Sequence, residues 1–218
     1  MSHHDYITMP HPRSKVQSMT SQELSTAPNT MRNVSFAVVD FETTGLNPET
    51  DRIVQLAAVI VNGEGHIVDS FDTIVKPESP TEYQHGAEHI HGISAEQVSG
   101  GMPLRKALER LWSINAGHVF TAHNAAFDLG FLHAESKRVG LEGHVDVHVD
   151  TLELARRTTG ADTTRKHNLF ALCEHYGIKR DKEHDAKSDA TATAQLLMHL
   201  IKELGVETPD QVAELFTP

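Results

Sequence analysis

Two carboxylates stand two residues apart at the end of an apolar, β-branched run of the sequence. Asp40 and Glu42 follow the stretch SFAVV at 35–39. If the extended conformation continues, both side chains leave the same face of a strand. Like charges side by side at the edge of a core are unfavourable unless a proton or a cation compensates them, so the pair favours a divalent metal. Two solvated acids at a strand end are the alternative interpretation of this pair alone.

Two more acids lie on stripes that are otherwise apolar. Asp128 precedes Phe131 and Leu132 by three and four residues, which places it on the face that a helix there would bury. Asp189 precedes Ala192 by three residues and extends the apolar stripe of the last expected helix. Helix starts also favour acids through the helix dipole, and this accounts for part of the pattern. Both acids are predicted to point inward, which is unusual for Asp.

His184 comes directly before that last helix, in a loop from which an imidazole could project into the same cavity. The chain contains 16 histidines, so the position of His184 is informative only beside the acids. The next residue, Asp185, is expected to cap the helix. Other histidines allow a different interpretation, in which one of two clusters binds zinc. These clusters are His85, His89 and His91, and His144 with His148.

Three motifs carry a resemblance to a known family. They are VVDFETTGL at 38–46, TAHNAAFDLGFL at 121–132 and HDAKSDA at 184–190. In their order and intervals they resemble the three exonuclease motifs of the DEDDh superfamily, and the likeness extends from about Ser35 to Leu204. Within that superfamily the sequence is most similar to the proofreading epsilon subunits of bacterial DNA polymerase III and to related free-standing exonucleases.

The resemblance implies a chemistry for these residues, that of a 3′-to-5′ exonuclease that releases 5′-mononucleotides. By resemblance, His184 would be the general base, and two Mg²⁺ ions, for which Mn²⁺ can substitute, would be bound by Asp40, Glu42, Asp128 and Asp189. Oxygen ligands suit these hard cations better than they suit zinc. In such a centre one cation lowers the pKa of the attacking water and the other neutralises the leaving 3′ oxygen.

The resemblance also implies which residues touch the substrate. The turn after the first acid pair would hold the terminal nucleotide, with Leu46 wedged against its base. The segment HIHGIS at 89–94 contains a histidine that would lie near the same nucleotide. The substrate contacts so expected are Thr43, Thr44, Gly45, Leu46, His91, Asn124 and Phe127.

The first motif gives an indication of the polymer. ETTGL at 42–46 is typical of epsilon-like DNA exonucleases, whereas oligoribonucleases typically carry a methionine after the glutamate. We therefore expect single-stranded or frayed DNA 3′ ends as the substrate, with RNA trimming as the alternative.

The partners are less well defined by the sequence. Epsilon subunits bind the polymerase through an extension after the nuclease domain, and this chain ends at ETPDQVAELFTP. Association with DNA polymerase III and free-standing repair or clean-up both stay open. A catalytically silent nucleic-acid-binding or scaffold module would be expected to lack at least one metal acid, and none is lost.

The elements that must position these residues follow from hydrophobic periodicity. Apolar runs predict strands at 35–40, 52–61 and 66–76, and NGEG at 62–65 predicts the hairpin turn of an antiparallel meander. The other expected elements are a helix from Pro103, a strand at 118–123, helices at 125–139, from Leu152 and at 186–204, and a short C-terminal helix. This order predicts an α/β domain with a mixed sheet. The resemblance implies a ribonuclease H-like fold, a mixed sheet of about five strands flanked by helices.

Residues 1–33 show no sustained period and are predicted to form a flexible N-terminal tail, with a single exonuclease domain at 34–218. The segment at 157–166, rich in Thr, Gly and charge, is expected to be an exposed loop. Cys173 is the only cysteine, which excludes an intrachain disulfide and a thiolate zinc cluster and favours a buried, inert thiol.

The composition limits the partners and the location. A formal net charge of -11 argues against sequence-blind binding of duplex through a broad basic face. The sequence has no apolar run of the roughly 18 residues that a membrane span requires, and its first residues lack the apolar core of a secretory signal. We therefore expect a cytoplasmic protein with no membrane partner.

Overall fold

The computed structural model describes residues 16–17, 30–78, 83–160, 166–182 and 184–217. Its centre is a mixed sheet with the strand order β5-β4-β3-β2-β6-β8. The six strands are β2 (Ser35–Thr43), β3 (Ile53–Asn62), β4 (Ile67–Lys76), β5 (Met102–Pro103), β6 (Val119–Ala122) and β8 (His148–Asp150). The strands β2, β3 and β4 form an antiparallel meander, whereas β6 and β8 continue the sheet in parallel with β2.

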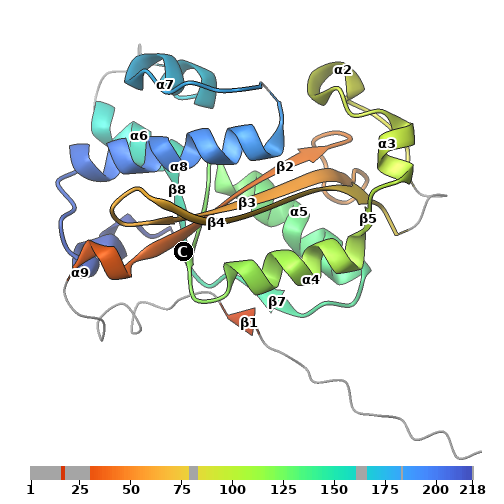
Figure 1. Ribbon diagram of the computed structural model, residues 1–218, viewed down its shortest axis with the longest axis horizontal. Coiled ribbons are helices and arrows are strands. Elements are labelled where there is room, and N and C mark those ends of the chain that lie inside the picture. The colour runs from red at the N-terminus through yellow and green to blue at the C-terminus, as the bar shows by residue number, and fades with distance from the viewer. Residues whose placement is uncertain (1–15, 18–29, 79–82, 161–165, 183, 218) are drawn as a thin grey trace, which may run out of the picture.

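Helices cover both faces of this sheet (Figure 1). The larger ones are α4 (Leu104–Asn115), α5 (Ala125–Arg138), α6 (Thr151–Thr159), α7 (Leu169–Tyr176) and α8 (Ala186–Glu203). One apolar core joins α6, α7 and α8 to one face of the sheet, and a second core joins α4 and α5 to the other face. The chain therefore folds into three layers, with the sheet in the middle.

The alternation of side chains along β2 decides which of its residues face α8. Phe36 and Val38 belong to the core under α8, whereas Ala37 and Val39 belong to the core over α4 and α5. Successive residues of a strand project to opposite faces. Asp40 and Glu42 continue the even-numbered row, so β2 directs both carboxylates to the side on which α8 begins.

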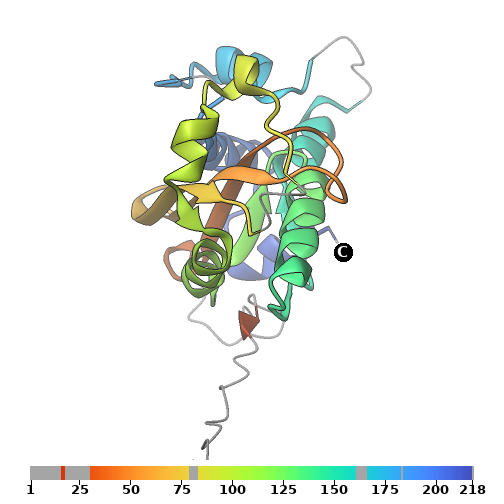
Figure 2. The same cartoon turned by 90° about the vertical axis from the view of Figure 1, so that its right-hand side faces the viewer.

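The smaller elements lie around the ends of the sheet. They are β1 (Val16–Gln17), which pairs in parallel with β7 (Gly143–His144), the 3₁₀ turns η1 (Met31–Asn33) and η2 (Ala213–Leu215), and the short helices α2 (Glu88–His91), α3 (Ala95–Ser99) and α9 (Pro209–Val212). The helices α2 and α7 lie at the top of both views of the molecule (Figures 1 and 2). The carboxyl end of β2 lies beside the start of α8, because Gln55, the partner of Glu42 in β3, bonds to Asp185 and Ala186. The Thr44 carbonyl lies against Gly86, just before α2.

The structure confirms the predicted α/β class, the antiparallel meander and the turn that joins β3 to β4. Gly65 in this turn has a φ of 86°, and its N–H donates to the carbonyl of Asn62 at 2.8 Å. The sheet has six strands instead of about five, because the two-residue β5 adds to the edge of β4 and is too short to show a period. Residues 161–165 of the predicted loop lie outside the described residues, and 157–159 end α6 instead.

Two further expectations bear on chemistry and location. Cys173 is a buried free thiol, as predicted. None of the helices in the described ranges combines the length and the apolar character needed to cross a bilayer. Most of the predicted N-terminal tail lies outside the described residues, so the division at residue 33 stays a prediction.

Candidate functional site

The carboxyl end of β2 carries the first acid pair. Asp40 and Glu42 pair with Ala57 and Gln55 of β3, and the register shifts between Glu42 and Thr43, which marks a bulge. A bulge bends a strand and re-aims its side chains. After this shift Thr43 still pairs with Ile53, and the chain then leaves the sheet and forms the turn that contains Gly45.

The other two acids come from the first turns of helices on opposite sides of the sheet. Asp128 in α5 is 4% exposed and Asp189 in α8 is 7% exposed, so both point inward as the apolar stripes predicted. Asp185 caps α8 as predicted, because its carboxylate accepts the N–H of Ser188 at 3.1 Å. The helix starts thus bring Asp128 and Asp189 to the end of β2 from two directions.

Electrostatic repulsion couples the four acids. Burial raises the pKa of Asp40 well above its ordinary value, and the charges of Asp128, Glu42 and Asp189 raise it further. Arg180 acts in the opposite direction. Since three carboxylates repel the charge of a fourth, the chain concentrates negative charge at a partly dry position, which is unfavourable without a cation.

Glu42 and Asp189 show the same conflict. Burial raises the pKa of Glu42 to about 7, and the charges of Asp189 and Asp185 add to the shift. Burial also raises the pKa of Asp189, although hydrogen bonds from Arg180 oppose the rise. Hard, oxygen-preferring divalent cations fit such a donor set, because they supply the missing positive charge and accept several carboxylates. The residues present therefore fit a metal centre.

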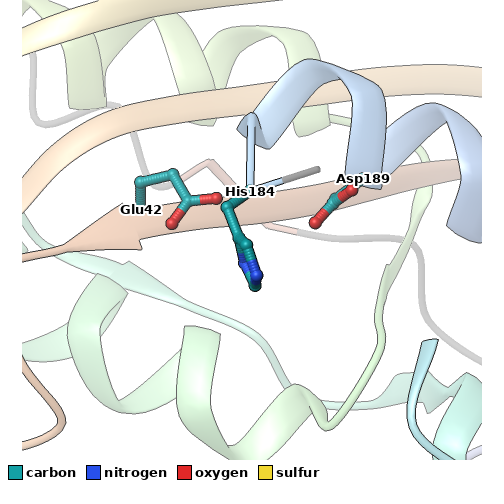
Figure 3. A group of neighbouring side chains, drawn as sticks. All are labelled: Glu42, His184 and Asp189. Atoms are coloured by element: carbon teal, nitrogen blue, oxygen red, sulfur yellow. The ribbon is translucent and has the colours of Figure 1, made fainter. Parts of the chain in front are cut away.

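His184 lies beside two of these acids. One ligand atom each from Glu42, His184 and Asp189 lies within 4.8 Å of the other two, and the three side chains approach one another in Figure 3. His184 is exposed and has a φ of 52°, a left-handed conformation that is uncommon outside glycine. The loop before α8 is thus bent in a way that brings the imidazole to the acids, as the sequence predicted.

Sequence reasoning missed Arg180, which is the cation already present in the cluster. Its guanidinium donates to Asp189 through three contacts, with Nε and Nη2 at 3.0 and 2.7 Å from Oδ1 and Nη2 at 3.0 Å from Oδ2. The contact crosses a loop with no regular period, so no pattern in the sequence indicates it.

Sequence reasoning also missed Asp150, which holds the starts of two helices. Its carboxylate accepts the N–H groups of Asn124 and Leu152 at 2.9 Å and that of Ala125 at 3.2 Å. Because α5 begins at Ala125, this acid fixes the helix that presents Asp128. A recognisable signal was its place after a short apolar run and directly before a helix, which is typical of an N-cap.

The turn after β2 is stiffened by its own side chains. Thr43 donates to the Gly45 carbonyl at 2.6 Å, and the Thr44 hydroxyl accepts the N–H of Arg52 at 3.0 Å and donates to Asp51 at 3.3 Å. A Cβ at Gly45 would lie 2.5 Å from the Asp51 carboxylate, so a larger residue there would have to displace that carboxylate. The next side chain, Leu46, is 84% exposed, which leaves a large apolar group free at the rim of the acid cluster.

A buried acid and a partly exposed arginine on α5 hold the outer part of this turn. Glu135 is fully buried and accepts the N–H of Ile53 at 3.3 Å. Arg138 lies 3.3 Å from the Glu135 carboxylate and donates to the carbonyls of Pro48 and Glu49 at 2.6 and 2.7 Å. The helix that presents Asp128 therefore also fixes the loop that presents Leu46.

Three expected substrate contacts come from other elements. Asn124 is exposed at the start of α5, with a φ of 68°, and Phe127 is partly buried with its ring 4.9 Å from that of Phe131. His91 is only 2% exposed; its Nδ1 accepts the N–H of Ile93 at 3.0 Å and its Nε2 lies 3.2 Å from the Gly86 carbonyl. Both ring nitrogens of His91 thus hold the backbone, and its contact with a nucleotide stays a prediction.

The alternative zinc clusters do not form in the described part of the chain. The only group of three or more potential ligands that meets there is Glu42, His184 and Asp189. His85 instead contacts Tyr83 and lies 3.0 Å from the Glu88 carboxylate, and His144 stacks on His133. The rings of His85 and His91 lie edge to face with centroids 6.4 Å apart, but no third ligand joins them in the described residues.

Comparison with known proteins identifies relatives of this arrangement. A family model described as Exonuclease matches residues 37–197. The DNA polymerase III PolC-type of Listeria welshimeri is 35% identical over 173 residues, which are 79% of this chain and 12% of that protein. The PolC-type polymerase of Oceanobacillus iheyensis is 36% identical over 170 residues, which are 78% and 12% of the two chains. The chain thus spans 12% of the length of these relatives.

Solved structures confirm the expected fold. The nuclease domain of 3′hExo, a DEDDh family member bound to rAMP, has a TM-score of 0.66 at 18% identity and covers 78% of this chain and 92% of its own. Exonuclease X in complex with 5′ overhanging duplex DNA has a TM-score of 0.59 at 24% identity, with coverages of 83% and 98%. Exonuclease I of E. coli in complex with a dT13 oligonucleotide has a TM-score of 0.63 at 19% identity, with coverages of 79% and 42%.

Proposed function

This chain belongs to the exonuclease family, and we propose that it is an exonuclease of the DEDDh type that removes 5′-mononucleotides one at a time from the 3′ ends of DNA. The observation that carries the proposal is the meeting of acids at the end of β2: ligand atoms of Glu42, His184 and Asp189 lie within 4.8 Å of one another, and Asp128 is buried at the start of α5. Such a site fits hydrolysis of a phosphodiester, because it can hold cations against a substrate that is itself negative.

The four acids would hold two divalent cations, Mg²⁺ in the cell with Mn²⁺ as a substitute. When bound there, such cations lower the pKa of the attacking water and neutralise charge on the leaving 3′ oxygen. Asp40 is best placed to serve both, because it is the acid on which the other three act. The buried positions of Asp128 and Asp189 keep the ligands from turning away into solvent.

His184 would be the general base that takes the proton of the attacking water. Its position in an exposed loop beside Glu42 and Asp189 supports this role, since the ring can face the substrate and still hand its proton to solvent. A general base must lie within hydrogen-bond reach of the water it deprotonates. The bent backbone at His184 is the feature that brings the ring to the acids.

The turn after β2 would hold the terminal nucleotide. Leu46 offers an exposed apolar face for stacking against a base. Because its turn is already stiff, binding would cost less conformational entropy of the loop. Thr43, Thr44 and Gly45 shape that turn. Asn124 and Phe127 would line the opposite side.

We favour DNA as the polymer, and RNA is the second candidate. The relatives with about one third identity are PolC-type DNA polymerases, and Exonuclease I and Exonuclease X are solved with DNA. The structure of 3′hExo contains rAMP, which favours the RNA alternative. We also propose a cytoplasmic location and association with a DNA polymerase III, because the chain is similar to the PolC-type polymerases.

The test uses matched DNA and RNA oligonucleotides labelled at the 3′ or the 5′ end, incubated with Mg²⁺ or Mn²⁺. The 3′ label should leave at once as a mononucleotide, while the 5′-labelled strand shortens step by step. Asp40→Ala should abolish the loss, whereas Asp146→Ala, an exposed acid far from the cluster in sequence, should not. Full activity in Asp40→Ala, or binding of strands without shortening, would refute the mechanism. A strong preference for RNA would overturn only the choice of polymer.

A further inference from the structure

Arg180 is the one cationic side chain that the described structure hydrogen-bonds to a member of the acid cluster. Nε and Nη2 of its guanidinium contact both oxygens of Asp189, at 2.7 to 3.0 Å. Both side chains are only 10% exposed. A two-pronged pair of this kind, shielded from water, is stronger than an exposed ion pair.

The same contacts occupy both lone pairs of Asp189 Oδ1 and one of the two on Oδ2, which are lone pairs that a metal ion would use. Asp189 is one of the four proposed metal acids, and the guanidinium donates to each of its oxygens. A cation on those oxygens would meet the positive charge of Arg180 at close range in a partly dry site. Arg180 and a cation on Asp189 therefore compete for one carboxylate.

We propose that Arg180 is a resident counter-ion of the site, which neutralises Asp189 before metal binds and releases that carboxylate when a divalent cation takes it. The inference rests on the proposed function, because it requires the acid cluster to be a metal centre. It assigns a role to a residue that lies outside the three motifs. Arg180 would be a positioning residue, since it acts through Asp189.

The position of Arg180 in the chain gives the exchange a second consequence. Arg180 lies in the loop between α7 and α8 that also carries His184. One end of this loop is fixed where the N–H of Ile178 bonds to the Cys173 carbonyl, and the other where Asp185 caps α8. The pair with Asp189 is one of the links between this loop and α8, beside the hydrogen bond from the Lys182 N–H to the Ser188 hydroxyl at 3.2 Å, so its release removes one restraint on Arg180 itself.

The test is a calorimetric titration of Mn²⁺ into the full chain after removal of metal with a chelator. Arg180→Gln should bind Mn²⁺ about tenfold more tightly than the wild type, because Mn²⁺ no longer has to displace the Arg180 guanidinium from Asp189. Arg180→Lys keeps the charge but loses the two-pronged geometry, so its affinity should lie between the two. Arg156→Gln is the matched control, because it removes the same charge from an exposed pair with Glu153 and should leave Mn²⁺ affinity unchanged.

Thermal unfolding gives a second readout that a purely structural arginine would not produce. In EDTA the Arg180→Gln variant should melt roughly 5 °C below the wild type, since Asp189 is left without its partner. With saturating Mn²⁺ the two proteins should melt within about 2 °C of each other, because the ion replaces the guanidinium. An equal loss in both conditions would overturn the proposal. If Arg180→Gln does not fold, Arg180→Lys carries the same comparison.

The titration separates failure of this inference from failure of the proposed function. Wild-type protein that binds Mn²⁺, with Asp189→Asn weakened and Arg180→Gln unchanged or weaker, would refute the role of Arg180 alone. Wild-type protein that binds no Mn²⁺ would refute the metal centre and the inference together. Tighter binding by Arg180→Gln beside an unchanged Arg156→Gln would support both.

Discussion

The buried acids near the start of α5 differ in what compensates the charge of their carboxylates. Asp150 is one case, and Asp40 with Asp128 is the other. Asp150 is surrounded by backbone donors, since the N–H groups of Asn124, Ala125 and Leu152 all bond to it. Asp40 and Asp128, by contrast, have pKa values raised by burial. The charges of Asp128, Glu42 and Asp189 raise the pKa of Asp40 further; at Asp128 backbone hydrogen bonds oppose the rise, and the charges of Asp150 and Glu42 add to it. Both positions are largely closed to water, yet only Asp150 receives three backbone donors.

The difference separates an acid that builds the fold from acids that serve a function. A carboxylate with several N–H donors is stable as an anion and stabilises the helices that supply those donors. Carboxylates that crowd together raise the free energy of the folded state unless a proton or a cation joins them. Such a cost is typical of a binding site, which is the role that we propose for the cluster.

The largest expected effect removes one member of the cluster. Asp40→Asn should lower the rate of 3′-end hydrolysis by about 1000-fold or more, because the bridging acid of the proposed centre is lost. In EDTA the same variant should be as stable as the wild type or more stable, since one of four like charges is gone. Single-turnover kinetics and urea unfolding measure the two effects. A marked loss of stability would place Asp40 with Asp150 and refute the distinction.

The opposite outcome is expected at Asp150. Asp150→Ala leaves three N–H donors without their acceptor and should lower the free energy of unfolding by about 4 kcal/mol. Activity should fall only as far as the shift of α5 disturbs Asp128. Urea unfolding in EDTA checks the prediction, with Asp146→Ala as the exposed-acid control. A stability loss below that of the control would contradict the structural role.

The dependence of stability on pH tests the surroundings of Asp150 through the neighbouring residue His123. Burial lowers the pKa of His123 to about 4, although the charge of Asp150 opposes the shift. Between the ordinary pKa of 6.5 and the folded pKa, the unfolded chain therefore binds more protons than the folded chain. The stability that the neutral His123 ring contributes is present above this pH window and is lost as the pH falls through it. The expected loss is about 3 kcal/mol. His123→Asn should show a flatter dependence of unfolding free energy on pH from 6.5 to 4; an equal slope in both proteins would refute the assignment.

Glu135 is an intermediate case and should give a smaller effect. Its burial raises its pKa, and within the described structure Oε2 has no hydrogen-bond partner, while the other oxygen accepts the N–H of Ile53. Glu135→Gln keeps an acceptor but removes the charge facing Arg138, so stability should change by about 1 kcal/mol. Because the pair holds the loop of Leu46, KM for oligonucleotides should rise a few fold while kcat changes little. A fall in kcat alone would contradict this role.

The smallest effect is expected at the rim. Leu46→Ala should leave stability within about 0.5 kcal/mol of the wild type, because the side chain is exposed. It should raise KM for single strands a few fold through the loss of base stacking. Steady-state kinetics on a labelled oligonucleotide measures the change. An unaltered KM would remove Leu46 from the nucleotide site.

The sequence predicts the fold and the acids because both depend on regular periods. The run SFAVV fixes which face of β2 carries Asp40 and Glu42, and the helical stripes at Phe131 and Leu196 fix the inward direction of Asp128 and Asp189. The sequence does not predict Arg180 or the three donors of Asp150, because these contacts join segments through loops without a period. It also misses β5, since two residues cannot show an alternation. Long-range pairing decides these features, and local pattern does not encode it.

The central claim is that the crowded acids at the end of β2 form a divalent-metal centre. The most direct measurement is anomalous X-ray scattering from crystals of the full chain soaked with Mn²⁺ and a nucleoside 5′-monophosphate. The account predicts two Mn²⁺ peaks among Asp40, Glu42, Asp128 and Asp189, with the guanidinium of Arg180 no longer on Asp189. Peaks only elsewhere on the protein, or an acid cluster without metal beside an intact Arg180–Asp189 pair, would contradict it.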